Sequence, residues 1–324
     1  MSKITLADFR AGQKIVYRYM RPTPAYAWPL LAERLHTRVV VKHENHTPAG
    51  AFKVRGGLTY FEQLKKREPN CRGVITATRG NHGQSVGIAA NRNGIQATIV
   101  VPHGNSVEKN AAMKALGIQL IEYGNDFQAS REHAQLLSLE HELHMVPSYH
   151  QDLVLGVASY WLEFFETAPD LQRVYVPIGM GSGICSAVLA RDALGLNVDV
   201  IGVVSAHAPA YSLSFEAGKV IEAPTTTKLA DGMACRAPDA DALAIIQRGV
   251  KEMVLVTDEE IADAMRIYFS DTHNVAEGAG AAPLAAALKQ IRASESTVQR
   301  KVIGLPLCGG NVDSDVFAKV LLGV

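Results

Sequence analysis

Short β-rich runs alternate along this chain with longer stretches of helical pattern, and this alternation limits the possible folds more than any other feature. Several of the runs are continuously apolar, which is typical of strands in a parallel sheet that helices cover on both faces. The sequence therefore predicts an α/β fold. The expected strands are residues 38–42, 73–76, 97–101, 119–123, 173–177, 198–204 and 302–307.

The strand and helix unit repeats most compactly between about residues 65 and 151, where helices are expected at 85–93 and 106–116. This repeat predicts a small doubly wound domain over 65–151, inserted into a large domain formed by 1–64 plus 152–324. No low-complexity segment, charge block or proline-rich linker marks a boundary, so these limits depend on the pattern alone.

Composition excludes several classes of partner. The 324 residues include 48% hydrophobic residues, which are enough for one large or two ordinary domains. Lys plus Arg equals Asp plus Glu at 32 each, so no net field attracts nucleic acid or an anionic membrane. We therefore expect a small-molecule partner that is neutral or zwitterionic, with no nucleic acid and no membrane as partners.

The amino terminus carries several charges, and no run of about 18 uncharged apolar residues occurs. A cytoplasmic protein is therefore expected. Cys71, Cys185, Cys235 and Cys308 are scattered without a Cys-x-x-Cys pair, which argues against a structural zinc site and a disulfide framework. We expect four reduced thiols.

Lys53 lies in an apolar and glycine-rich segment, residues 48–57 with the sequence PAGAFKVRGG. Desolvation disfavours the ammonium form and lowers the pKa of a lysine, and a neutral amine is the form that makes a Schiff base. The alternative is a lysine in the first helical turn with its ammonium group in water. The segment alone favours that alternative, and further motifs are needed to reverse the choice.

A glycine-rich loop, GMGSG at residues 179–183, follows one expected strand directly and precedes a helical pattern over 184–194. Glycines let the backbone approach a ligand, and the amides at a helix start attract phosphate oxygens. The alternatives are a plain strand-to-helix turn and a dinucleotide site. Ile184 replaces the third glycine of a dinucleotide motif, and Ser205 stands where the ribose would need an acid. A single phosphate is the better interpretation.

A second polar turn, TATRGNHGQ at residues 76–84, also lies between an expected strand and a helix. Its amides and the Thr78 hydroxyl suit a substrate carboxylate, and the Asn81 amide can donate to a ring oxygen. The alternative is an ordinary N-capping turn. His82 is interpreted as a structural hydrogen-bonding residue in preference to a proton carrier.

Cys308 lies at the end of the last expected strand, in the segment LCGGN at residues 307–311. The two glycines allow another group to come close. The thiol is either a small core residue, which the segment by itself favours, or a weak neutral hydrogen-bond partner for a heterocycle.

Taken together, these four segments and the ADG sequence at residues 230–232 resemble the fold-type II pyridoxal-phosphate enzymes, specifically the serine/threonine dehydratase and serine racemase branch. The segments occur in the family's order over nearly the whole chain. The resemblance implies two doubly wound α/β domains of the tryptophan synthase β type, pyridoxal 5'-phosphate in the cleft between them, and a homodimer.

The resemblance also assigns roles to residues. It implies that Lys53 forms the Schiff base with the cofactor, that Phe52 packs beside the ring, and that Asn81 contacts the ring hydroxyl. Cys308 takes the place, usually serine, that faces the pyridine nitrogen. The cofactor phosphate is assigned to Gly179, Met180, Gly181, Ser182 and Gly183, and the substrate carboxylate to Thr78, Arg79, Gly80, Asn81 and His82.

The implied activity is that of an ammonia-lyase, which converts threonine or serine-type β-hydroxy amino acids to a 2-oxo acid and ammonia by α,β-elimination. Lys53 is the expected base at Cα, and a neutral thiol at Cys308 favours elimination over transamination. The alternatives are an amino-acid racemase or β-replacement enzyme on the same scaffold and, outside enzymes, a protein that only binds the cofactor or another ligand.

The chain departs from the family at two places. Arg79 stands where serine racemases carry the serine that protonates the opposite face of Cα, which argues against racemisation. It either points away into an ion pair or faces the substrate, in which case 3-hydroxyaspartate or phenylserine is the expected substrate. Ser205 and Tyr211 replace the acidic ligands of metal-activated members, so no metal site is expected, and the lone carboxylate of Glu277 is interpreted as structural. With the sequence ending at Val324, a carboxy-terminal regulatory domain is not expected.

Overall fold

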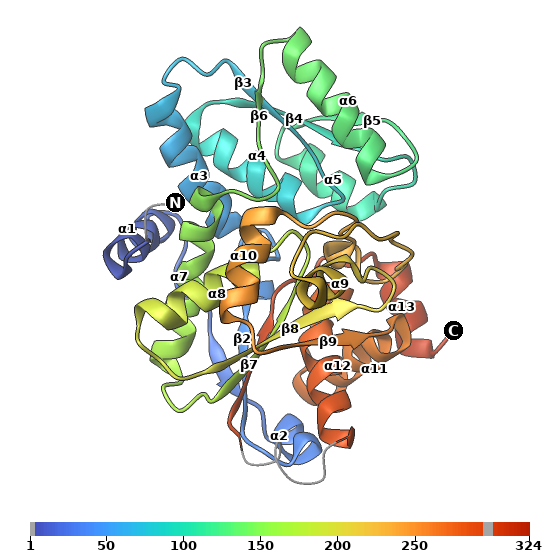
Figure 1. Cartoon of the computed structure of the whole chain (residues 1–324). Coiled ribbons are helices and arrows are strands. Elements are labelled where there is room, and N and C mark those ends of the chain that lie inside the picture. The colour runs from blue at the N-terminus through green and yellow to red at the C-terminus, as the bar shows by residue number, and fades with distance from the viewer. Residues whose placement is uncertain (1–3, 294–300) are drawn as a thin grey trace.

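The computed structural model describes residues 4–293 and 301–324, which form two β-sheets with helices against them (Figure 1). The larger sheet has six strands in the order β1-β2-β10-β7-β8-β9, and the smaller has four in the order β5-β4-β3-β6. All pairings are parallel except that of β1 with β2. The predicted α/β class is confirmed.

The elements have the following bounds. The strands are β1 Ala25–Ala27, β2 Val39–His43, β3 Gly73–Ala77, β4 Gln96–Val101, β5 Gln119–Glu122, β6 His144–Met145, β7 Arg173–Pro177, β8 Asp199–Ser205, β9 Glu252–Val256 and β10 Ile303–Leu307. The α-helices are α1 Leu6–Tyr17, α2 Pro29–Leu35, α3 Lys53–Arg67, α4 Asn81–Asn93, α5 Val107–Ala115, α6 Phe127–Glu140, α7 Gln151–Thr167, α8 Ser182–Ala193, α9 Ala210–Ala217, α10 Ala240–Gly249, α11 Asp258–Thr272, α12 Gly278–Ala293 and α13 Ser314–Leu322. Two single 3₁₀ turns are η1 Glu44–His46 and η2 Asp231–Met233.

Alternate residues of the central strands are buried on opposite faces of each sheet, as the continuously apolar runs require. In β2, Val39 and Val41 join a core formed with α11 and α12, whereas Val40 joins the core formed with α7 and α8. In β3, Val74 faces α3 and α4, and Ile75 faces α6. Both sheets are therefore covered on both faces, which explains why their sequences do not alternate.

All seven expected strands are present, with ends that differ by at most one residue. The three strands that were missed have physical reasons. β1 and β6 have only three and two residues, which is too short for a periodic signal. β9 is an edge strand with a mixed burial pattern. The expected helix at 85–93 begins earlier, at Asn81, because the polar turn itself forms its first turn.

The strands of the smaller sheet lie within residues 65–151, and those of the larger sheet lie outside this range. Helix α3 crosses the predicted limit at 64, and α7 begins at Gln151, so the exact domain limits stay a prediction. In the described residues, no helix combines the length and the apolar character needed to cross a membrane.

A buried ionic network joins four elements beneath the start of α3. Arg55 of α3 contacts Glu44 of η1 through Nε at 2.7 Å and Glu163 of α7 through Nη1 at 2.6 Å. Lys42 of β2 donates a second hydrogen bond to Glu163 and one to the carbonyl oxygen of Thr23. All four charged side chains are at most 5% exposed. The two cations and two carboxylates balance one another, which is what allows them to be buried.

We predict that Arg55→Met lowers the free energy of unfolding by about 3–5 kcal/mol, because it leaves two buried carboxylates without their main partner. Chemical denaturation would measure the change. Arg38→Met is the matched control, since it removes the Arg38–Asp170 pair, whose side chains are both 48% exposed, and should cost less than about 1 kcal/mol. Equal losses in the two variants would contradict the prediction.

Candidate active site

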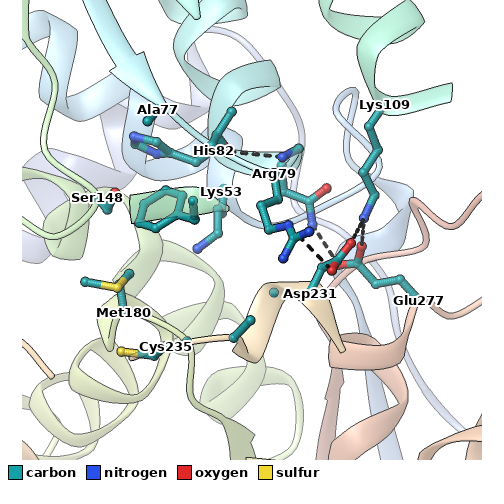
Figure 2. A pocket seen from close by; sticks show the side chains of 17 residues that line it. Lys53, Ala77, Arg79, His82, Lys109, Ser148, Met180, Asp231, Cys235 and Glu277 are labelled. Carbon is teal, nitrogen blue, oxygen red and sulfur yellow. Dashed lines mark hydrogen bonds and ion pairs between the residues drawn. The ribbon is translucent and has the colours of Figure 1, made fainter. Parts of the chain in front are cut away.

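The loops that follow β3 and β7 meet at a cavity. Both loops leave the carboxyl ends of parallel strands, where binding sites of α/β proteins are usually found. Figure 2 shows Lys53 in this cavity, with Met180 and Cys235 on one side and Arg79, Lys109, Asp231 and Glu277 on the other. Eight of the predicted site residues line it, namely Lys53, Thr78, Arg79, Gly80, Asn81, His82, Gly179 and Met180.

Five other predicted site residues lie behind this lining. Phe52 is next to Lys53, and its ring centroid is 4.7 Å from Lys53 Nζ. The amide of Phe52 donates to the carbonyl oxygen of Cys308 at 3.0 Å. Gly183 lies against the Phe52 ring. Gly181 and Ser182 complete the loop, and the ligand roles of all five stay predictions.

Lys53 is the first residue of α3, so its side chain leaves the helix at the cavity. Burial lowers the pKa of Lys53, and the nearby Cys308 and Glu277 oppose this shift without reversing it. The amine therefore loses its proton more easily than a surface lysine does. This environment favours a nucleophile and base over a solvated ammonium group.

The glycine-rich loop has a backbone that only small residues permit at two positions. A Cβ atom on Gly179 would lie 2.1 Å from the carbonyl oxygen of Gly232. Gly181 has a φ of 102° and caps the amino terminus of α8. Tyr211, one of the residues that replaces an acidic ligand, donates from its hydroxyl to the Met180 carbonyl at 3.1 Å. The first amides of α8 have no intrahelical acceptor, which suits an anion.

The turn after β3 presents the start of α4 to the cavity. Thr78 Oγ1 accepts a hydrogen bond from the Gly80 amide at 3.0 Å, which fixes the turn, and no side chain of the N-cap residue Gly80 caps α4. Asn81 Nδ2 donates to Glu277 Oε1 at 2.6 Å, and Asn311 Nδ2 donates to Asn81 Oδ1 at 2.8 Å. These bonds fix the orientation of the Asn81 amide.

His82 carries an unpaired nitrogen. Its Nε2 atom is buried and has no hydrogen-bond partner. Burial, assisted by Lys53, lowers the pKa of His82 to about 3. The ring is therefore neutral at physiological pH. Its Nε2 atom does not make the structural hydrogen bond that was expected of His82.

Arg79 both lines the cavity and approaches a carboxylate, so the two alternatives for this residue are not exclusive. Its Nε atom lies 3.8 Å from Asp231 Oδ1. Lys109 of α5 lies 3.8 Å from Asp231 Oδ2 and 3.7 Å from Glu277 Oε2. Burial raises the pKa of Glu277, while Lys109 and the Asn81 hydrogen bond act against this shift. One wall of the cavity is therefore ionic.

The chain is similar in sequence and in fold to known proteins. The family model described as pyridoxal-phosphate dependent enzyme matches residues 16–309. The chain belongs to this family. The predicted family, fold and cofactor are thereby confirmed, and pyridoxal phosphate is the cofactor of this family member.

Individual relatives of this pyridoxal-phosphate dependent enzyme cover most of its length. It is 32% identical to the L-threonine ammonia-lyase of Thermotoga maritima over 98% of this chain and 78% of that protein. It is 28% identical to the L-threo-3-hydroxyaspartate ammonia-lyase of Saccharomyces cerevisiae over 98% and 97%. The processed form of threonine deaminase isoform 2 from Solanum lycopersicum superposes with a TM-score of 0.90 at 28% identity, covering 98% of this chain and 92% of that one.

The residues present fit pyridoxal phosphate. Burial raises the pKa of the Cys308 thiol, and Glu277 adds to this shift, so Cys308 is a neutral partner that lies in the core. The unpaired Nε2 of His82 and the free amides at the start of α8 are donors or acceptors that a bound polar group can satisfy. Among residues 4–293 and 301–324, no group of three or more His, Cys, Asp or Glu side chains is placed to bind a metal ion.

Sequence reasoning missed Lys109 and gave Glu277 only a structural role. Lys109 lies on a helix with several other charged residues, so nothing in the sequence distinguishes it. The sequence does carry a local signal at Glu277, because Gly278 and Gly280 follow it. In the structure Gly309 also faces this carboxylate. A Cβ atom on Gly309 would lie 2.3 Å from Glu277 Oε1. Only the fold shows that these residues reach the cavity.

We predict that His82→Gln leaves the acidic limb of the pH dependence of kcat/KM in place between pH 5 and 9. The pKa of His82, about 3, lies below this range, so the ring has no proton to lose there. The prediction concerns only the position of the acidic limb, so a uniform decrease of kcat/KM at all pH values does not contradict it. A displaced acidic limb in the variant would show that His82 is the titrating group.

We also predict that Gly179→Ala lowers the free energy of unfolding by about 1–3 kcal/mol, because the added methyl group meets the rigid carbonyl of Gly232. Gly183→Ala is the matched control in the same loop, since the nearest atom to its new Cβ would be 3.6 Å away. Urea denaturation of both apoproteins would decide. A similar loss in the two variants would show that the close approach of Gly179 is unimportant.

Proposed function

We propose that this chain is a pyridoxal-phosphate-dependent ammonia-lyase that converts β-hydroxy amino acids to 2-oxo acids and ammonia. The reaction class predicted from the sequence is confirmed by relatives with ammonia-lyase activity in their names, including the Thermotoga maritima and Saccharomyces cerevisiae proteins. The observation that carries the proposal is Lys53, a lysine with a lowered pKa in a cavity between two anion-binding turns.

The turn that includes Thr78 and Asn81 is the proposed site for the substrate α-carboxylate. Its amides lie at the amino terminus of α4, where the helix dipole favours an anion. His82 is neutral and adds no charge that would need a second counter-ion. The turn therefore orients Cα toward Lys53, which lines the same cavity.

The cofactor site is proposed from the same walls. The amides of 179–183 would hold the phosphate, Asn81 the ring hydroxyl, and Cys308 the ring nitrogen. When bound, pyridoxal phosphate supplies a ring that withdraws electrons from Cα. Because its pKa is raised, Cys308 keeps its own proton and donates no charge to the ring.

Lys53 is the proposed base. Its unprotonated amine would remove the proton from Cα, and the lowered pKa of Lys53 favours this form relative to a surface lysine. The hydroxyl group then leaves from Cβ, and the product hydrolyses in water to the 2-oxo acid and ammonia. A guanidinium is a poor proton donor to carbon, so Arg79 does not suit the role of acid at the opposite face of Cα, which disfavours racemisation.

Three finer statements accompany this proposal. We propose a homodimer, as the resemblance implies, and a cytoplasmic location. We also propose that residues 65–151 form the small domain, because their strands make a sheet of their own.

We predict that Lys53→Ala lowers kcat for 2-oxo acid formation by about 10²–10⁴-fold, because the base at Cα is lost. The variant should also lose the visible absorbance that the wild-type protein shows with bound cofactor. Threonine, serine, 3-hydroxyaspartate and phenylserine should each be assayed for 2-oxo acid and ammonia. Lys65→Ala, on the exposed end of α3, is the control. Retained absorbance and turnover in Lys53→Ala, or an amino acid as the product, would contradict the proposal.

A further inference from the structure

A buried tyrosine behind the glycine-rich loop has no role in the proposed reaction. Tyr211 belongs to α9 and packs in the core formed with α7 and α8. Its side chain does not line the cavity. Its hydroxyl oxygen nonetheless lies 3.1 Å from the carbonyl oxygen of Met180, in the middle of the loop. A polar group that contacts the loop from within the core needs an explanation beyond packing.

The hydrogen bonds of the Tyr211 hydroxyl fix the direction of its proton. The backbone amide of Asp239 lies 3.3 Å from this oxygen and can only donate. The hydroxyl therefore accepts from Asp239 and donates its own proton to the Met180 carbonyl. Burial raises the pKa of Tyr211, so the proton stays on the hydroxyl at physiological pH. Asp239 is itself fixed, because its carboxylate caps α10 by accepting from the amides of Asp241 and Ala242.

The bond to the Met180 carbonyl orients a whole peptide unit. In a planar trans peptide, the C=O of one residue and the N–H of the next point in opposite directions. The Met180 carbonyl points at Tyr211 in the core, so the amide of Gly181 points away from Tyr211. Gly179 and Met180 line the cavity on the other side of the loop. In the described part of the chain, the Gly181 amide donates to no acceptor.

Gly181 permits the close approach of the tyrosine. Its φ of 102° lies in a region that residues with a side chain rarely adopt. A Cβ atom at this position would lie 3.1 Å from the Tyr211 hydroxyl oxygen and 2.8 Å from Ala242 Cβ. The hydroxyl and the bare α-carbon of Gly181 thus fit against each other.

The orientation of this peptide matters for an anion. A flip of the unit between Met180 and Gly181 would exchange its carbonyl for its amide, and the glycine makes such a flip sterically accessible. The flipped loop would present an oxygen where a phosphate needs a donor. The Tyr211 hydroxyl opposes the flip, because it and the carbonyl would both lose a partner in the core. A donor that is oriented in advance costs less to use in binding.

We propose that Tyr211 is a positioning residue for the cofactor phosphate, because its hydroxyl holds the peptide between Met180 and Gly181 with the amide toward the site. The inference rests on the proposed placement of the phosphate at residues 179–183. It adds a residue that acts through the loop from within the core.

The test compares pyridoxal phosphate with pyridoxal, which has a hydroxyl group in place of the phosphate. In Tyr211→Phe the ring still fills the core, but the hydrogen bond to the Met180 carbonyl is lost. Titration of the apoproteins, followed by the absorbance of the bound compound, should show that the variant binds pyridoxal phosphate at least about tenfold more weakly than the wild type. Its affinity for pyridoxal should change by less than about twofold, because pyridoxal has no phosphate for the loop.

Tyr175→Phe is the matched control. Tyr175 is also buried, and its hydroxyl donates to Gln290 Oε1 of α12 at 2.8 Å. The control should lower the urea midpoint of the apoprotein about as much as Tyr211→Phe does, since each removes a buried tyrosine hydroxyl. Its affinity for pyridoxal phosphate should stay within about twofold of the wild type. The pair separates a loss of folding stability from a loss of loop orientation.

Three results would overturn the inference: unchanged affinity of Tyr211→Phe for pyridoxal phosphate, an equal loss of affinity for pyridoxal, or an equal loss in Tyr175→Phe. The ammonia-lyase function would stand in each case if the wild-type holoenzyme releases 2-oxo acid and ammonia. A wild-type protein that binds pyridoxal as tightly as pyridoxal phosphate would refute the proposed phosphate site and the inference with it. If the holoenzyme forms no 2-oxo acid while Tyr211→Phe loses affinity for the phosphate form alone, the proposed function fails and the inference stands.

Discussion

The contact of Arg55 with Glu44 and Glu163 is the interaction on which the position of Lys53 depends. Arg55 lies half a helical turn beyond Lys53, and its partners come from η1 and α7. A buried guanidinium requires both carboxylates, so α3 cannot shift along its axis without breaking hydrogen bonds that have no replacement in the core. The first residue of α3 is thereby held at the cavity.

The parallel sheets supply the other half of the site. Every strand pairing except β1 with β2 is parallel, so within each sheet the carboxyl ends of these strands lie at the same edge. The loops after β3 and β7 leave these edges. Each of these loops leads into the amino terminus of a helix, α4 or α8. Two helix starts, which are places that favour anions, thus face one cavity, and Lys53 lines the same cavity.

The two sides of the cavity differ in charge. The neutral side, near Met180 and Cys235, contrasts with the wall of Arg79, Lys109 and Asp231 (Figure 2). The two sides of the cavity therefore offer different chemistry to a ligand.

The sequence by itself determined the α/β class, seven of the strands, and the segments that hold Lys53, the glycine-rich loop and the Asn81 turn, because burial periodicity and glycine placement are local signals. It missed β1 and β6, which are too short to show a period, and it left Arg79 with two alternatives. Only the tertiary structure brought Lys109 across Gly80 and Glu277 to Asn81. Those contacts join residues far apart in the chain, and no local pattern encodes which side chains will share a wall.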